Sequence, residues 1–219
     1  MGHKSSSTLR LPPAVSAAAL AAVGGKRLQK EFAWMSWAGT VWRLEGETGV
    51  VYVKRAAHLA DERDRTAWFA GRLPVPEVLG LYRGFGDDWL LLRAVPGVPL
   101  HDPSLGWEPA RVARRFGEIL REIHAVDSKG CPYGEPGKGH VLIHGDYCLP
   151  NVLVQDGRLS ALIDMGGAGL GNPEDDLAAG VWTLQYNYGP GYAREFLEGY
   201  GWPPMSDKAI ERLRRRYSR

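Results

Sequence analysis

Cysteine is scarce in this chain: only Cys131 and Cys148 occur among 219 residues. Their spacing matches no metal-ligand motif, and reduced thiols are the ordinary state of two such residues in the cytosol. Charge of one sign is also in short supply, since the formal net charge is only +2. An excess that small gives no reason to expect nucleic acid or a membrane surface as a partner. The sequence predicts a cytoplasmic protein.

A long apolar run is lacking too. The best candidate is Ala14–Val23, which is rich in alanine and too short to cross a bilayer. Pro12-Pro13 before it and Gly24-Gly25 after it are typical of a helix start and stop. We therefore expect a surface helix here rather than an export signal.

Overall composition is that of a folded protein, with 44% apolar and 24% charged residues. A chain of this length can bury a core as one domain or as two lobes. Most of the positive excess lies after Glu211, in an arginine-rich stretch that we interpret as a solvated helix end.

Strand and helix signals alternate along the chain and favour the α+β class. Apolar runs separated by turn residues predict a hairpin and a second strand pair, with a helix between them, and a further helix follows Pro96–Pro99. This proline-glycine segment is the best lobe boundary, which gives lobes of residues 1–95 and 96–219. The expected strands are 42–45, 50–54, 78–83 and 89–95, and the expected helices are 59–73 and 109–126.

The most informative segment runs from Val141 to Gly166. Short apolar runs predict strands, and three polar residues stand in tight loops at their ends: Asp146, Asn151 and Asp164. Phosphoryl transfer of the protein-kinase kind needs such a set. One Asp accepts the proton of the attacking hydroxyl, while an Asn and the Asp of a D-x-G turn bind magnesium.

The string HGDYCLPNVLVQDGRLSALIDMG in this segment resembles the catalytic and metal loops of the aminoglycoside phosphotransferases. The resemblance implies a protein-kinase-like fold, ATP as phosphate donor and Mg²⁺ as metal. It further implies that Asp146 is the catalytic base, that Asn151 and Asp164 bind the metal, and that Asp176 supports the catalytic loop. His144 is expected to anchor this loop by hydrogen bonds rather than to move protons.

Lys54 is the next candidate, because it shares a strand face with Tyr52 and can reach nucleotide phosphates. Leu59, Glu62, Thr66, Phe69 and Leu73 follow the spacing of one helical stripe. An inward Glu62 implies a cation nearby, and Lys54 is the natural partner. The family resemblance supports this pair, although the seven residues between them are fewer than usual. The alternative is that both side chains are solvated.

Weaker signals complete the nucleotide site. The stretch from Met35 to Val41 has one glycine and resembles the phosphate loop of the same family, which makes Ser36 a candidate. The alternative is an ordinary lead into a strand. Adenine is expected to bond to the backbone near Arg93 and Val95.

The acceptor is less well defined. An aminoglycoside or related aminocyclitol hydroxyl is the leading expectation from the resemblance. The short segment between Cys131 and His144 and the basic C-terminal stretch favour instead another metabolite, such as a sugar or amino alcohol. A nucleotide-binding homologue without turnover is a third interpretation, disfavoured by the complete Asp146, Asn151 and Asp164 set. The oligomeric state stays open.

Overall fold

The computed structural model describes residues 9–36, 39–134 and 141–217, and these form two compact units. The first unit comprises the residues up to Asp64 together with Glu77–Ala94. The second comprises Arg65–Pro76 and the residues from Val95 onward. Helices and antiparallel sheets occur together, which confirms the predicted α+β class.

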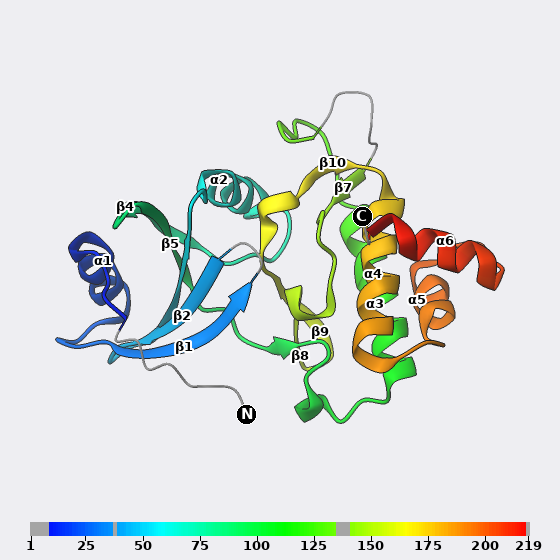
Figure 1. The fold of residues 1–219 in the computed structure, drawn as a ribbon, viewed down its shortest axis with the longest axis horizontal. Helices are drawn as coiled ribbons and strands as arrows, with labels where there is room; N and C mark the ends of the chain where they lie inside the picture. The colour runs from blue at the N-terminus through cyan, green and yellow to red at the C-terminus, as the bar shows by residue number, and fades with distance from the viewer. Residues whose placement is uncertain (1–8, 37–38, 135–140, 218–219) are drawn as a thin grey trace. The chain divides into compact units, whose positions relative to one another are not determined.

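The first unit is built on an antiparallel sheet whose five described strands run in the order β1-β2-β3-β5-β4 (Figure 1). The predicted hairpin is present as β2 and β3, with its turn at 46–49. Strand β1, which pairs with β2, was not among the predicted strands, and the predicted phosphate loop of Met35–Val41 covers the connection between these two strands, of which 37–38 lie outside the described residues. The strands are β1 (Gln29–Ser36), β2 (Gly39–Glu45), β3 (Val50–Ala56), β4 (Val78–Gly84) and β5 (Asp87–Arg93).

The two faces of this sheet differ in what they carry. Val51 and Val53 of β3 point into an apolar core that also contains residues of α1 (Pro13–Val23). The prediction of a helix at this position is thus confirmed. Tyr52 and Lys54 alternate with the two valines and therefore occupy the opposite face. The alternation of side chains along β3 therefore places the apolar core on one face of the sheet and the Lys54 side chain on the other.

Helix α2 (Ala60–Phe69) is shorter than the predicted helix, because the chain turns after Phe69 through Gly71, whose φ is +82°. All five residues of the predicted stripe are nevertheless buried. The start of the helix is fixed from the sheet, since the Leu59 amide donates to the Asp88 carboxylate at 3.0 Å. That anchor sets the rotation of the first helical turn, and with it the direction of Glu62.

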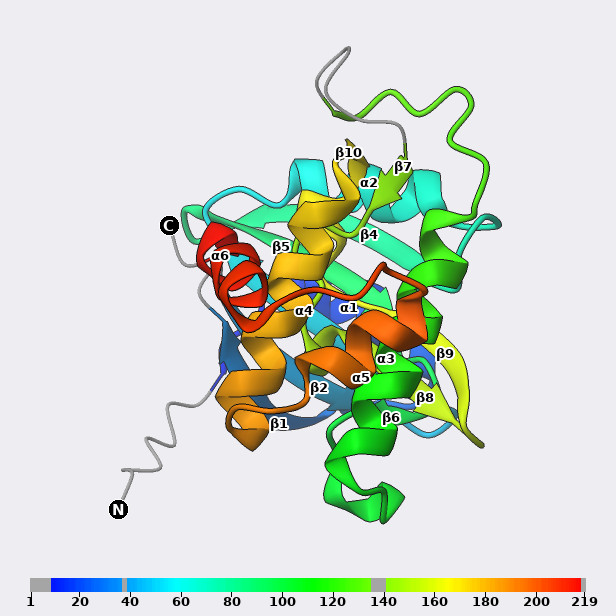
Figure 2. The ribbon, with the colours of Figure 1, turned by 90° about the vertical axis from the view of Figure 1, so that its right-hand side faces the viewer.

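The second unit is mainly helical. Figure 2 shows α5 (Ala193–Tyr200) beside α3 (Pro109–His124) and α6 (Asp207–Tyr217) beside α4 (Pro173–Tyr188). The core contains inward side chains of α3, α4 and α5 together with those of the short strands between α3 and α4. These strands are β7 (Val141–Ile143), β8 (Val152–Gln155), β9 (Arg158–Leu162) and β10 (Gly169–Gly171), with 3-10 turns η2 (Leu149–Asn151) and η3 (Met165–Gly167). Before α3 come the short strand β6 (Val98–Pro99), which pairs with β8, and the 3-10 turn η1 (Pro103–Leu105).

Two glycines allow α3 and α5 to touch through their backbones. A Cβ added to Gly117 of α3 would collide with the carbonyl oxygen of Phe196. A Cβ on Gly199 of α5 would collide in the same way with the carbonyl of Arg114. Because packed interiors do not absorb an extra carbon without moving, this crossing is specified by the absence of side chains.

Two global expectations can be checked here. Both cysteines are free thiols, as predicted. Among the described residues, no helix is long and apolar enough to cross a membrane.

Replacement of Gly117 by Ala should lower the free energy of unfolding by about 2 kcal/mol or more, because the new methyl group must push two helix backbones apart. Chemical denaturation measures the loss. Gly49→Ala is the matched control, since nothing lies within 4 Å of the added Cβ. Equal stability of the two variants would contradict the close crossing.

Candidate active site

The loop between β7 and β8 carries His144 to Asn151, and its path depends on Gly145. Gly145 has a φ of +81°, and a Cβ there would collide with the carbonyl of Gly167. The loop thus runs in direct contact with Gly167, at the end of the 3-10 turn η3 that follows Asp164. Only glycine combines that backbone angle with so close an approach.

Asp176 holds this loop from below. One carboxylate oxygen accepts the His144 amide at 2.7 Å and the other accepts the Gly145 amide at 2.8 Å. His124 adds a contact of 3.2 Å to the first oxygen, and its other ring nitrogen meets the Tyr200 hydroxyl at 2.9 Å. Asp176 is fully buried, so these bonds offset the cost of removing a carboxylate from water. Its place in the first turn of α4 adds favourable helix-dipole interaction.

His144 links the loop to the strand that leads to Asp164. Its Nδ1 accepts the Asp146 amide at 3.3 Å, so Nε2 carries the proton and donates to the Ile163 carbonyl at 3.0 Å. The ring is buried, with 1% exposed. His144, with both ring nitrogens hydrogen-bonded, therefore connects the two loops.

Asn151 lies at the centre of the arrangement. Its side-chain amide donates to the carboxylate of Asp146 at 3.1 Å and to the carbonyl of Asp146 at 3.0 Å. Its own carbonyl accepts the Ile163 amide at 3.0 Å, in line with the pairing of β8 with β9. Asp146, Asn151 and the start of the D-x-G turn are therefore neighbours in space.

Asp164 adopts a left-handed backbone conformation with a φ of +62° and opens η3. A residue with a Cβ pays a steric cost of about 1–2 kcal/mol in this conformation. Such outliers concentrate at functional sites, where the surroundings hold them in place. The left-handed backbone thereby helps to determine the direction of the half-buried Asp164 carboxylate, together with its side-chain rotamer.

The second carboxylate oxygen of Asp146 faces residues outside the loop backbone. It accepts a hydrogen bond from the Tyr217 hydroxyl at the end of α6, and the Cys148 thiol lies 3.4 Å away. Burial, and next the charge of Asp146, raise the pKa of Cys148 to about 12. This thiol therefore stays protonated at neutral pH and is a poor nucleophile.

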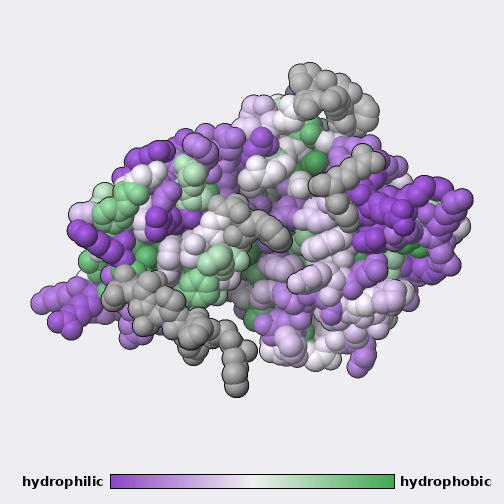
Figure 3. Space-filling view, viewed as in Figure 1, coloured by the Kyte–Doolittle hydropathy of each residue, from purple (hydrophilic) through white to green (hydrophobic). Residues whose placement is uncertain are grey.

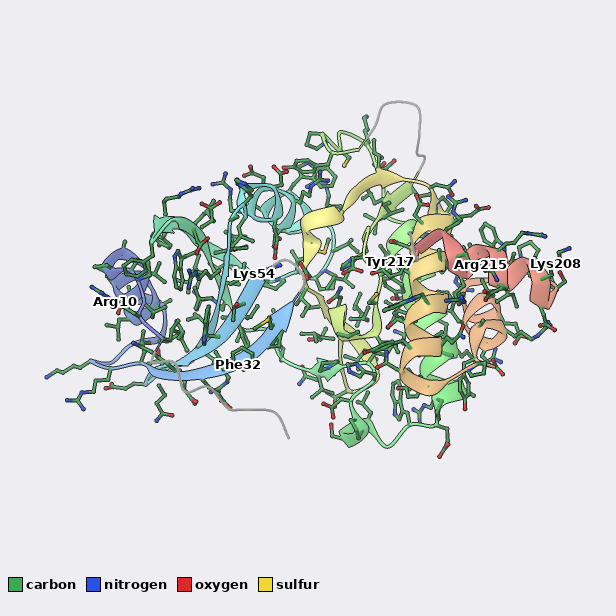
Figure 4. All side chains as sticks on the ribbon, viewed as in Figure 1. Arg10, Phe32, Lys54, Lys208, Arg215 and Tyr217 are labelled. Atoms are coloured by element: carbon green, nitrogen blue, oxygen red, sulfur yellow. The ribbon has the colours of Figure 1, made fainter. Side chains whose placement is uncertain are left out.

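In the first unit, Lys54 Nζ and Glu62 Oε2 are 2.6 Å apart, and both side chains are more than nine-tenths buried. Figure 4 labels Lys54. The ion pair expected from the sequence is present. Asp88, which caps Leu59 at the start of the same helix, has its pKa lowered mainly by that amide and further by Arg83. Asp88 of β5 thus anchors the start of α2, and Glu62 of α2 in turn fixes the buried Lys54 ammonium of β3.

The donor set suits a hard divalent cation. Among the described residues there is no cluster of three or more His, Cys, Asp and Glu side chains that could hold a metal. Asn151 and Asp164 still offer an amide oxygen and a carboxylate, the oxygen ligands that Mg²⁺ prefers alongside phosphates and water. Because the nitrogen of the Asn151 amide is turned to Asp146, its oxygen faces away from that carboxylate.

A model of the phosphotransferase enzyme family matches residues 30–139 and 134–214, which is most of the chain. The chain belongs to the phosphotransferase enzyme family. This phosphotransferase is 26% identical over 196 residues to an aminoglycoside 3'-phosphotransferase of Niallia circulans, which covers 69% of the chain and 75% of that relative. It is 29% identical over 176 residues to the streptomycin 3''-kinase of Streptomyces griseus, which covers 56% of the chain and 64% of the kinase.

Solved structures agree on the fold. An aminoglycoside 3'-phosphotransferase of type VIII superposes with a TM-score of 0.71 at 24% identity, covering 92% of this chain and 98% of the other. An aminoglycoside phosphotransferase in ternary complex with AMP-PNP and hygromycin B gives a TM-score of 0.60 at 16% identity, with coverage of 87% and 89%. The predicted kinase-like fold is confirmed.

The residues selected from the sequence fall into two groups in the phosphotransferase. Asp146, Asn151, Asp164, His144 and Asp176 gather in the second unit. Lys54 and Glu62 pair in the first.

The weaker candidates are less well connected. The backbone of Ser36 ends β1 opposite Gly39, whereas its side chain lies outside the described part of the chain. The Arg93 guanidinium pairs with Glu77 at 2.5 Å, and the Arg93 amide donates to the Glu77 carbonyl. Val95 is half-buried. The Ala94 amide donates to the Val50 carbonyl, so adenine would have to use backbone groups of 93–95 other than the amides of Arg93 and Ala94.

Tyr217 is the contact that the sequence analysis missed, because the stretch was interpreted only by its arginines. The signal was available in the 3-4 spacing of Ile210, Leu213 and Tyr217, which marks an inward face on α6. Leu213 is buried, and Ile210 and Tyr217 pack against the same core.

Asp176→Asn should cost about 2–4 kcal/mol of stability, because the NH2 group of the amide would face one of the two backbone donors and the buried charge would be removed from its partners. Thermal and denaturant unfolding provide the measurement. Asp175→Asn, one residue earlier and exposed, should cost less than about 1 kcal/mol. A small effect at Asp176 would show that the loop is held in another way.

Proposed function

We propose that this phosphotransferase transfers the γ-phosphate of ATP to a hydroxyl group of a small molecule. The observation that carries the proposal is the cluster in which Asn151 bonds to the Asp146 carboxylate and, through its carbonyl, to the residue before Asp164. Base and metal ligands of a kinase must lie this close, because the attacking oxygen and the transferred phosphate meet at one point.

Asp146 acts as the general base. The Asn151 amide orients its carboxylate, and the loop backbone is held by Asp176, so the side chain loses little freedom when an acceptor arrives. The proton of the acceptor hydroxyl passes to Asp146 as the oxygen attacks phosphorus. His144 has both nitrogens engaged and takes no proton in this scheme.

Asn151 and Asp164 would hold Mg²⁺ together with the phosphates of ATP. The metal, when bound, neutralises charge on the β- and γ-phosphates. The left-handed backbone of Asp164 directs its carboxylate for this purpose, and the Asn151 amide serves the base with its nitrogen and the metal with its oxygen.

The lobe of residues 1–95 would bind the nucleotide, and the lobe of 96–219 would supply the catalytic groups. Lys54, fixed by Glu62, would contact the α- and β-phosphates. Trp34 and Tyr52 form an aromatic pair with ring centroids 5.7 Å apart, and Tyr52 shares the sheet face of Lys54. Such a pair suits contact with a planar base. Ser36, Arg93 and Val95 stay candidates through their backbone or hydroxyl groups.

The acceptor is proposed to be an aminoglycoside or related aminocyclitol, as the names of the relatives suggest. One feature favours a second candidate, an acceptor that is not a polycation. Helix α6 is strongly hydrophilic at the surface (Figure 3) and rich in arginine, and it ends at Tyr217 beside the proposed base. Like charges repel, so an ammonium-rich substrate would be disfavoured there unless Glu174, Asp175 and Glu211 offset the guanidinium groups.

An ATP-consumption assay against a panel of aminoglycosides, sugars and amino alcohols distinguishes these acceptors. Turnover with aminoglycosides supports the first, and turnover with the other alcohols supports the second. ATP binding with no turnover on either group contradicts the proposed function.

Replacing the base and the metal ligand should separate binding from chemistry. We expect Asp146→Ala to lower kcat by about 10²–10⁴-fold while the Kd for ATP stays unchanged, because the base contacts only the acceptor. Asp164→Ala should abolish the magnesium dependence of nucleotide binding. Isothermal titration with and without Mg²⁺, alongside turnover, checks both. Asp207→Ala, at an exposed ion pair with Arg194, is the control. Full activity in both test variants would refute these roles.

Glu62→Gln should raise the KM for ATP by about tenfold, which corresponds to about 1.4 kcal/mol, because the Lys54 ammonium loses its charged partner. Steady-state kinetics with varied ATP measure the change. Glu198→Gln breaks an exposed pair with Arg114 and should leave the KM within about twofold. An unchanged KM in Glu62→Gln would exclude a nucleotide role for the pair.

A further inference from the structure

Both oxygens of the Asp146 carboxylate are engaged, but by partners of different kinds. Oδ2 accepts the side-chain amide of Asn151 at 3.1 Å. Oδ1 accepts the Tyr217 hydroxyl and faces the Cys148 thiol. Asn151 and Cys148 belong to the same loop as the carboxylate, whereas Tyr217 comes from α6, 71 residues further along the chain.

Tyr217 is brought to this oxygen by the packing of α6 on α4. Leu213 is buried in the core of the unit, and the Tyr217 ring lies 5.2 Å from the Trp182 ring. Arg216 pairs with Asp175 in the first turn of α4 at 2.7 Å. In Figure 4, Tyr217 lies at the end of α6 opposite Lys208. The contact is therefore part of a packed helix and not an isolated surface side chain.

The hydrogen bond from Tyr217 to Asp146 is of the same kind that an acceptor hydroxyl must form with the base. An alcohol that attacks phosphorus must donate its O–H to the base, and Tyr217 donates an O–H to the same carboxylate. Oδ2 is held by Asn151, whose amide also bonds to the Asp146 carbonyl and so belongs to the structure of the loop. Oδ1 is the oxygen that an outside hydroxyl can approach.

We propose that the Tyr217 hydroxyl occupies the position of the acceptor hydroxyl on Asp146, so that α6 carries an intramolecular competitor that each acceptor must displace. This inference rests on the proposed role of Asp146 as base. It identifies α6 as a wall of the acceptor site and Tyr217 as a residue that sets acceptor affinity.

Displacement is physically accessible. Tyr217 is the last residue of α6, and helix ends open more readily than their centres. Arg216 is 40% exposed and its partners Glu174 and Asp175 are 39% and 49% exposed, and such exposed pairs contribute little to stability. The ring can therefore leave Oδ1 while Leu213 keeps the rest of the helix packed.

The test is Tyr217→Phe, which keeps the ring against Trp182 and removes only the hydroxyl. Because a hydrogen bond to a charged group is lost, acceptor-independent ATP hydrolysis should rise about tenfold, as water reaches Oδ1. The KM for kanamycin A, or for whichever panel alcohol is turned over, should fall by a similar factor with kcat within about twofold.

Tyr186→Phe is the matched control, since Tyr186 stacks on the same Trp182 but is 76% exposed. Both values should stay unchanged in it. A fall in kcat for Tyr217→Phe, or unchanged hydrolysis and KM, would overturn the inference.

Asp146→Ala, measured in parallel, separates the two levels of the account. Retained turnover in that variant means that the proposed function has failed at its base. Lost turnover in Asp146→Ala, combined with no effect of Tyr217→Phe, means that only the competitor role has failed.

Discussion

The carboxylate of Asp176 is the constraint on which the site depends. It is fully buried and accepts two successive backbone amides, those of His144 and Gly145, immediately before the proposed base. A buried charge is stable only when its partners are fixed. The hydrogen bonds that stabilise the buried Asp176 carboxylate therefore also fix the backbone that positions Asp146.

The N-terminus of α4 organises more than this loop. Asn172 caps the helix by accepting the Glu174 amide at 2.9 Å, and Asp175 pairs with Arg216 near the end of α6. One helical turn thus fixes the loop that carries the base and the helix that carries Tyr217. In the first unit, Asp88 has a comparable function, since its cap on Leu59 sets the helix from which Glu62 reaches Lys54. In both units, a carboxylate bonded to backbone amides positions the residues of the site.

Much of this could be predicted from sequence because short-range patterns carry it. Strand lengths, the helical stripe of Glu62 and the order of Asp146, Asn151 and Asp164 are local properties. The missing parts depend on strand pairing and on a contact between distant segments. Strand β1 was not predicted, and it is held in the sheet by its pairing with β2. Tyr217 meets Asp146 only through the packing of α6 on α4, which no pattern near either residue specifies.

The central claim is that neighbouring residues of one loop have different roles: Asp146 is the base, and Asn151 binds the metal. A crystal structure with Mg²⁺ and a non-hydrolysable ATP analogue tests it most directly. The account predicts that the Asn151 side-chain oxygen and the Asp164 carboxylate coordinate the metal, while Asp146 stays outside the coordination sphere and faces the γ-phosphate. Coordination of the metal by Asp146, or phosphates bound away from this loop, would contradict it.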